Sequence, residues 1–133
     1  MPENGDYFEV TLRETHLRWG EYRSSDSRVR IAGEGFIPIP ANDARRIGIY
    51  NSHNGEGIGY NEFYAKSEDE RYCGVIKTSG NSSAGSIYAK NISGSGDLKA
   101  FHNWFRDANI HPGTRIRIEW TSTTEVTFKV IER

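Results

Sequence analysis

The chain has 133 residues, of which 17 are basic and 18 acidic, for a formal net charge of −1, and 35% of its residues are hydrophobic. This length suits a single domain over residues 1–133, and three Trp, seven Tyr and six Phe residues exclude a disordered chain, which lacks large groups to bury. The single cysteine, Cys73, excludes an internal disulfide and a four-cysteine zinc site, and no apolar run approaches the roughly 20 residues that cross a bilayer.

Strand patterns dominate the first two thirds of the chain. Apolar and polar residues alternate over 8–12, which is the period of a half-buried strand. Residues 29–39 are predicted to form a second extended segment, whose end cannot be fully paired inside a sheet because Pro38 lies within it and Pro40 follows it. Three further segments are predicted as strands, namely 58–65, 71–77 and 86–92.

Two helices are predicted among these strands. Pro40 suits the first turn, and Gly48 the end, of a short helix over residues 41–47. Asp97 is a good N-cap for a longer helix, in which four apolar residues at spacings of three and four share one face. These four residues are Leu98, Phe101, Phe105 and Ala108.

The last 20 residues of the chain carry the clearest pattern. Apolar residues alternate with polar ones over 116–120 and again over 126–130, on either side of the polar turn TSTT. This pattern predicts a hairpin with one apolar face. Seven short strands, with a short helix after the second and a longer helix after the fifth, predict a mainly β fold, a seven-stranded open pseudobarrel with helices at its ends.

The distribution of charge along the chain indicates more about a possible polyanionic partner than the net charge does. Residues 71–96 include three basic residues and no acidic one, and residues 18–30 include four arginines against two acids. A local positive field attracts a polyanion even on a protein that is neutral overall. Ordinary scatter of surface charge is the alternative interpretation.

The order of elements resembles that of the B3 DNA-binding domain, a seven-stranded pseudobarrel. Two stretches match best, FIPIPANDARRIGI (36–49) and LKAFHNWFRDANIHPGTRIRIEW (98–120). The first resembles the family's strand ending in Ile-Pro before a small helix, and the second its aromatic helix, polar turn and alternating strand. Thr114 departs from the pattern, because many relatives place Asp after the Gly. The family includes plant transcription-factor domains and recognition domains of bacterial restriction endonucleases, which this chain resembles more.

The resemblance implies a way of binding duplex DNA. Relatives grip DNA with two arms that enter the major groove, and the matching arms here are residues 14–30 and 77–90. Arginine and asparagine side chains pair with base edges, whereas lysine, serine and threonine commonly hold phosphates. The candidate DNA-contacting residues are Arg18, Trp19, Tyr22, Arg23, Ser24, Ser25, Arg28, Arg30, Lys77, Thr78, Ser79, Asn81, Ser82, Ser83, Lys90 and Asn91.

The resemblance also implies the partners of the chain. Double-stranded DNA is the expected ligand, with no cofactor, no metal and no membrane, and the chain is expected to be the targeting module of a bacterial restriction system. Any nuclease or NTPase activity is then expected on another domain of a larger protein or on another chain. The amino end lacks the basic and apolar segments of a signal peptide, so a cytoplasmic location is expected.

No catalytic centre is predicted within the chain. The acid-x-Lys pattern of metal-dependent restriction nucleases does not occur on a predicted strand. The four histidines, His16, His53, His102 and His111, are scattered and lack metal-ligand spacing. Cys73 is predicted to be a small packed hydrophobe rather than a nucleophile.

Two other functions stay open. A carbohydrate- or peptide-binding β-barrel would use exposed tyrosines, and the candidates are Tyr22, Tyr50, Tyr60, Tyr64 and Tyr88. A reader of modified DNA would share the fold but would need a pocket for an extruded base.

Overall fold

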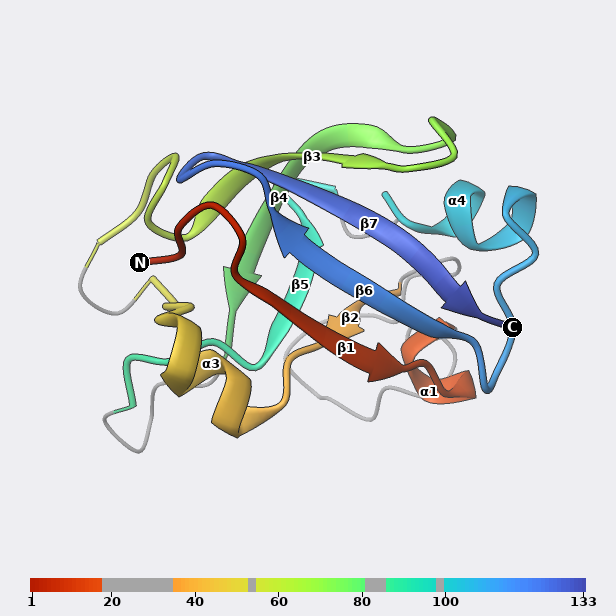
Figure 1. Ribbon diagram of the computed structural model, residues 1–133, viewed down its shortest axis with the longest axis horizontal. Coiled ribbons are helices and arrows are strands. Elements are labelled where there is room, and N and C mark those ends of the chain that lie inside the picture. The colour runs from red at the N-terminus through yellow and green to blue at the C-terminus, as the bar shows by residue number, and fades with distance from the viewer. Residues whose placement is uncertain (18–34, 53–54, 81–85, 98–99) are drawn as a thin grey trace.

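A computed structural model of the chain describes residues 1–17, 35–52, 55–80, 86–97 and 100–133. Most of the described secondary structure is β-strand, and the helices are short (Figure 1). The elements are, in chain order, β1 (Tyr7–Thr11), α1 (Glu14–Leu17), β2 (Ile37–Pro38), α3 (Ala41–Ile47), β3 (Glu62–Ser67), β4 (Cys73–Ser79), β5 (Asn91–Gly94), α4 (His102–Asp107), β6 (Arg115–Trp120) and β7 (Glu125–Glu132).

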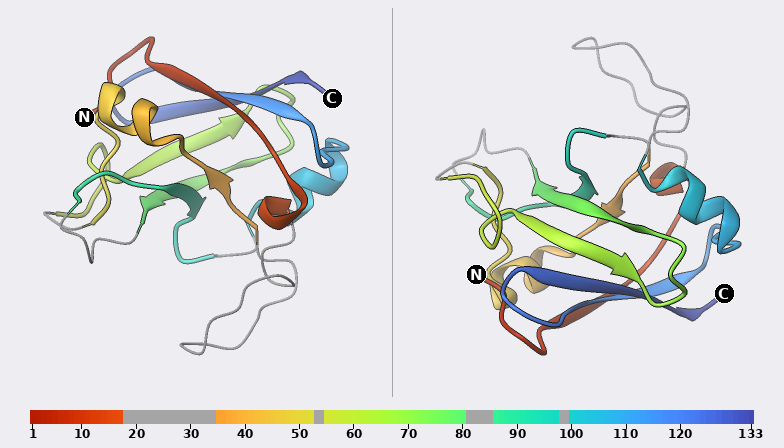
Figure 2. Two further views of the ribbon diagram at one scale, coloured as in Figure 1. Left: turned by 90° about the horizontal axis from the view of Figure 1, so that it is seen from below. Right: turned by 90° about the horizontal axis from the view of Figure 1, so that it is seen from above.

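The seven described strands form one sheet in the order β1-β6-β7-β3-β4-β5-β2. All neighbouring pairs are antiparallel except β3 and β7, which run parallel. The sheet curls until it is nearly closed into a barrel, and an unsealed seam remains between its two end strands, β1 and β2 (Figure 2). The predicted mainly β open pseudobarrel is therefore confirmed.

Alternate residues of the strands line the interior of the barrel. On β6, Ile116, Ile118 and Trp120 are fully buried, while the charged residues between them face outward, as the sequence predicts. The Trp120 ring lies 5.5 Å from that of Phe63. Burial raises the pKa of Tyr72, which stacks on a core phenylalanine, to about 12, with smaller contributions from the charges of Asp97 and Cys73.

Helix α3 spans the predicted residues 41–47. It follows Pro40 and ends at Gly48, whose φ of 81° is costly for any residue with a Cβ. The buried side chains of Ala44 and Ile47 face the core. The Arg46 guanidinium donates a hydrogen bond of 2.9 Å to the Tyr7 carbonyl, which ties this helix to β1, an end strand of the sheet.

Helix α4 is shorter than the predicted helix, and the prediction of Asp97 as its N-cap is wrong. The helix begins at His102, and its N-cap is Phe101, which makes no side-chain capping bond. Asp97 instead pairs with Gly94 in an isolated bridge at the end of β5, and its carbonyl accepts a turn hydrogen bond of 3.3 Å from the Ala100 amide. Leu98 lies outside the described residues. The other three residues of the predicted apolar face are buried, namely Phe101, Phe105 and Ala108.

The β3–β4 turn holds α4 in place through Asp69. The carboxylate of Asp69 accepts hydrogen bonds from the Ser67 hydroxyl, from the Arg71 backbone N–H and from the Trp104 indole N–H, the last at 3.4 Å. Partial burial raises the pKa of Asp69, but these three hydrogen bonds and the Arg71 charge outweigh it, so the pKa is lowered overall.

Strands β3 and β5 begin four and five residues later in the chain than the alternation predicts, and β4 begins two residues later. β3 begins at Glu62 because the amides of residues 60–62 all donate to the Gly57 carbonyl, which folds the predicted start into a turn. β5 covers only 91–94 because residues 87–89 bond instead to the backbone of residues 49–51.

The second predicted strand is present only as β2. It pairs with β5 and with no other described strand, which confirms that Pro38 lies in an edge strand. Residues 29–34 of the predicted strand lie outside the described residues. Helix α1 has only four residues, and the alternation of the sequence does not predict it.

Candidate nucleic-acid interface

Most of the predicted DNA-contacting residues lie outside the described residues. Within the first arm these are Arg18, Trp19, Tyr22, Arg23, Ser24, Ser25, Arg28 and Arg30, and within the second Asn81, Ser82 and Ser83. What the structure describes is the pair of roots from which the arms leave the barrel. The first root is made by Leu17 and Gly35, and the second by Gly80 and Ser86.

The first root is held together by α1 and the chain that leads into β2. The Phe36 amide donates a 3.0 Å hydrogen bond to the His16 carbonyl, and the two rings meet edge to face with their centres 5.2 Å apart. A Cβ on Gly35 would lie 3.0 Å from the Phe105 ring and 3.1 Å from the His16 carbonyl. The glycine therefore allows the chain to pack closely against both α1 and α4.

His16 also closes the first turn of α1. Its Nδ1 accepts a 2.9 Å hydrogen bond from the backbone N–H of Arg13, which requires Nδ1 to be unprotonated. Burial lowers the pKa of His16, and the positive charge of Arg13 lowers it further. The neutral imidazole is therefore the form that this root favours.

The second root lies where β4 and β5 meet. The Lys90 amide donates to the Ser79 carbonyl at 2.8 Å, and a Cβ on Gly80 would lie only 2.8 Å from that same amide nitrogen. Glycine at position 80 therefore lets the chain leave β4 while staying in contact with the strand that returns.

Between the two roots, β4 and β5 present a polar surface, here called the interarm face. The register places Lys77 opposite Ser93 and Ser79 opposite Asn91, with all four side chains on the outer side of the barrel. Lys90 stands exposed beside them. The interarm face thus consists of Lys77, Ser79, Lys90, Asn91 and Ser93.

The direction of β2 places this face between the arms. β2 is antiparallel to β5, with Ile37 opposite Ile92 and Pro38 opposite Asn91. The chain from Gly35 therefore reaches β2 at the Gly94 end of β5, whereas the second root lies at the Asn91 end. In Figure 2, β4, β5 and β2 lie side by side along this part of the barrel.

Ser79 and Asn91 form a hydrogen-bonded pair on the interarm face. The Ser79 hydroxyl donates to the Asn91 Oδ1 at 2.9 Å, and both side chains are half-buried. This bond orients the Asn91 amide. No described residue accepts a hydrogen bond from the amide nitrogen, so both of its hydrogens can be donated to a ligand. A fixed donor of this kind suits either a phosphate or the acceptor edge of a base.

The two lysines of the interarm face differ in their surroundings. Among the described residues, Lys90 has no carboxylate within ion-pair distance. The Lys77 ammonium lies 3.5 Å from the Glu56 carboxylate, which is on an exposed loop. Such a solvent-exposed pair is weak and exchanges readily for another anion.

One residue of the second arm is misassigned by the sequence. Thr78, a candidate DNA contact, is fully buried, and its hydroxyl donates a 2.7 Å hydrogen bond to the Tyr50 carbonyl. The reason is the alternation of β4, which turns Thr78 inward and its neighbours Lys77 and Ser79 outward.

An acid beside the interarm face, Glu62, is not among the candidate residues that the sequence predicts. Glu62 lies opposite Lys77 in the β3–β4 register, and its carboxylate accepts a 2.9 Å hydrogen bond from the Ser95 hydroxyl. The alternation of Glu62, Tyr64 and Lys66 could have placed it on the outer side of β3. Its proximity to Ser95 depends on strand pairing, which the local pattern does not contain.

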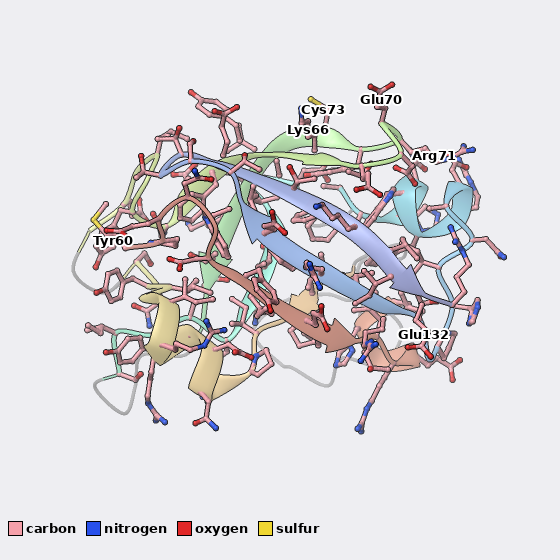
Figure 3. All side chains as sticks on the ribbon, in the orientation of Figure 1. Tyr60, Lys66, Glu70, Arg71, Cys73 and Glu132 are labelled. Atoms are coloured by element: carbon pink, nitrogen blue, oxygen red, sulfur yellow. The ribbon has the colours of Figure 1, made fainter. Side chains whose placement is uncertain are left out.

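Cys73 is exposed, so the prediction that it packs in the core is wrong. It lies opposite Lys66 in the β3–β4 register, and both side chains point away from the barrel (Figure 3). Tyr72, Gly74 and Ile76 are the residues of this stretch that turn toward the interior.

The candidate tyrosines do not form one open aromatic face. Tyr50 stacks on Tyr60 with ring centres 5.4 Å apart and lies 5.8 Å from the ring of Tyr88, and all three are half-buried. Tyr64 is 54% exposed, and Tyr22 lies outside the described residues.

The described residues offer no assembled metal centre, since no three His, Cys, Asp or Glu side chains among them are grouped to hold an ion. A polar groove of about 370 Å³ borders α4, and Arg71, Ser95, Asp97 and Asn103 contribute to its lining. None of the helices in the described part of the chain has the length and apolar character needed to cross a membrane.

Comparison of the chain with known protein families, curated proteins and solved structures finds no match. The resemblance to B3 domains therefore depends on the order of elements and on the two matching stretches, and DNA binding is a matter for proposal.

Proposed function

We propose that the chain is a B3-like module that recognises double-stranded DNA, with the two arms in the major groove and the interarm face against the duplex. The observation that carries this proposal is the Ser79–Asn91 pair, an oriented side-chain donor on a polar surface between the roots of the two arms. In this proposal the module acts in the cytoplasm and targets a bacterial restriction system, and cleavage belongs to another domain or chain.

The chemistry of the interarm face supports a polyanionic ligand. Lys90 lacks an ion-pair partner among the described residues, and Lys77 has only an exposed one. Lysines of this kind bind phosphates and release the counterions that surround DNA, so binding weakens as salt rises. The Asn91 amide then contributes a directional contact, which a diffuse charge does not provide.

Salt dependence tests this proposal directly. Binding to a random-sequence duplex should weaken by about 0.9 log units per log unit of salt for each phosphate that the protein contacts. Lys90→Ala should reduce this slope by about 1 and weaken binding to all sequences alike. Thermal unfolding should barely change, because Lys90 is exposed.

Lys66→Ala is the matched control. Lys66 is also an exposed lysine of the sheet, but it lies at the Cys73 end of β4, away from the interarm face. Its removal should leave the slope unchanged. Equal effects of the two substitutions would overturn the assignment of the interarm face, and salt-independent binding or none would overturn DNA recognition itself.

Selection of duplexes from random pools identifies the target. Parallel pools of unmodified and cytosine-methylated DNA distinguish a reader of ordinary sequence from a reader of modified bases. Enrichment confined to the methylated pool would favour the modified-base function, which requires a base pocket. Carbohydrate binding would instead show little dependence on salt.

A further inference from the structure

Glu62 holds a carboxylate over the outer side of β4, next to the interarm face. It is the first residue of β3 and lies opposite Lys77 of β4. Its Oε2 accepts a 2.9 Å hydrogen bond from the hydroxyl of Ser95, whose amide donates to the Val75 carbonyl on the far side of β4. The Glu62 side chain therefore reaches across β4 and is held at both ends.

Charge pairing does not account for this arrangement. The Lys77 ammonium contacts Glu56 at 3.5 Å, and no cation among the described residues lies within 4.0 Å of the Glu62 carboxylate. The second carboxylate oxygen, Oε1, accepts no hydrogen bond from any described residue. The result is a half-buried acceptor in a fixed orientation with one oxygen open.

A fixed acceptor limits which part of a duplex can lie beside it. Phosphates are repelled by a carboxylate, so the matching group must be a hydrogen-bond donor on a base edge. In the major groove, adenine N6 and cytosine N4 are such donors. Adenine also presents N7, an acceptor that a carboxylate repels, whereas cytosine presents only its amino group.

We propose that Glu62 accepts a hydrogen bond from N4 of a cytosine in the major groove, and that Ser95 is its positioning residue. This inference depends on the proposed DNA recognition and adds a base preference to it. The alternative is that Glu62 acts only as a negative charge, which would weaken binding to every sequence equally.

Glu56 offers a matched control for that alternative. It is also a glutamate near Lys77, but its side chain is 60% exposed, and among the described residues it contacts only the flexible end of that lysine. Glu56→Gln and Glu62→Gln each remove one negative charge from the same neighbourhood. Only the second removes a carboxylate that a serine holds in place.

The experiment measures base preference in the parent and in both variants. Duplexes selected by the parent are retested with each candidate cytosine replaced in turn by the other bases and by 2-pyrimidinone, which lacks the N4 amino group. At one position the parent should lose affinity by on the order of 10-fold for every replacement. Glu56→Gln should keep that preference, although its overall affinity rises.

Glu62→Gln should lose the preference, because the Ser95 hydroxyl then holds the amide oxygen and the amide nitrogen, a donor, faces the base. Ser95→Ala should lose part of it, since the carboxylate is present but not oriented. Thermal unfolding of each variant establishes that the variants are folded.

The outcomes separate the two proposals. If duplex binding is salt-dependent but no cytosine is required, or if Glu62→Gln and Glu56→Gln change affinity alike with the preference intact, the role of Glu62 is overturned and DNA recognition stands. If the parent shows no salt-dependent duplex binding, both proposals fail together.

Discussion

The outer surface of the barrel has two faces that differ in whether their charged and polar side chains are paired with one another. On β1, β6 and β7, Arg117 contacts the Glu9 carboxylate at 2.6 Å, and Lys129 lies 3.6 Å from Glu119. The Arg117 guanidinium also stands 4.6 Å from the centre of the Tyr7 ring, and its hydrogen bond to Glu9 raises the pKa of Arg117. This ion-paired face satisfies its own charges.

On the interarm face, formed by β4 and β5, two hydrogen-bond donors have no acceptor among the described residues. The Asn91 amide nitrogen and the Lys90 ammonium have no hydrogen-bond acceptor among the described residues. The net charge of −1 is therefore a poor guide to where on the surface a polyanion would bind. Ion pairs satisfy the charges of one face of the sheet, whereas on the other face Lys90 has no ion-pair partner among the described residues and would attract a phosphate in the proposed function.

The largest effect is expected where the oriented donor is removed. Asn91→Ala deletes the amide that Ser79 holds, and it should weaken binding to the selected duplex by about 1–3 kcal/mol, the usual value of one good side-chain contact to a base. Competition binding against a random duplex measures this loss. Ser79→Ala should cause a smaller loss, because the amide stays but loses its orientation.

An unchanged affinity in Asn91→Ala would remove the interarm face from the footprint. Asn91→Asp sharpens the test, because it keeps the shape and the acceptor for Ser79 but replaces the donor with a negative charge. Binding to all duplexes should then fall further than in Asn91→Ala.

A smaller effect, and one of a different kind, is expected on the ion-paired face. Arg117→Ala leaves the Glu9 and Glu119 carboxylates without their common partner, so the free energy of unfolding should fall modestly. Duplex affinity should not change. Parallel measurements of thermal unfolding and duplex binding test both parts.

Arg117→Lys serves as the control, because it keeps the positive charge and loses only the two-donor contact with Glu9. If Arg117→Ala weakened duplex binding as much as Lys90→Ala, the DNA footprint would extend over both faces and the comparison would fail.

The smallest effect is expected from a change of pH. It should appear at the first root, around His16, and not on β6 and β7. The pKa of His16 is lowered by folding, so the folded state binds fewer protons there and the contribution of His16 to stability is lost as pH falls below about 6.5, the unperturbed value. Protonation of Nδ1 also removes the acceptor for the Arg13 amide. The protection factor of that amide, which compares its exchange with the intrinsic rate at each pH, should fall between pH 7.5 and about 5.5.

Amides of β6 and β7 should keep their protection over the same range, because neither strand contains a histidine. His16→Asn is the control, since an asparagine oxygen accepts a backbone hydrogen bond without titrating. The same fall in protection in His16→Asn would assign the pH effect to another group.

The candidate site was only partly predictable from the sequence. Ser79, Lys90 and Asn91 are candidates from the sequence, because the second arm is polar and locally basic. Thr78 and Cys73 were placed on the wrong sides of β4. Apolar residues occur at consecutive positions in this stretch, so the pattern does not reveal which set turns inward.

Two local properties of the sequence determine much of the architecture. They are the alternation of apolar and polar residues in strands and the prolines and glycines at the ends of helices. The number and order of the strands, the bounds of α3, and the hairpin of β6 and β7 follow from the sequence alone. The alternation of apolar and polar residues in a strand indicates which residues share a side of the sheet. A proline or a glycine indicates where a helix begins or ends.

Which strands far apart in the chain become neighbours depends on the tertiary structure. The parallel pairing of β3 with β7, and the register that brings Glu62 to Ser95, join residues far apart in the chain. The packing of the barrel core selects such pairings, because a shift of one residue would turn a strand's buried side chains toward water. Local sequence sets the faces of each strand, and the closure of the sheet sets what those faces meet.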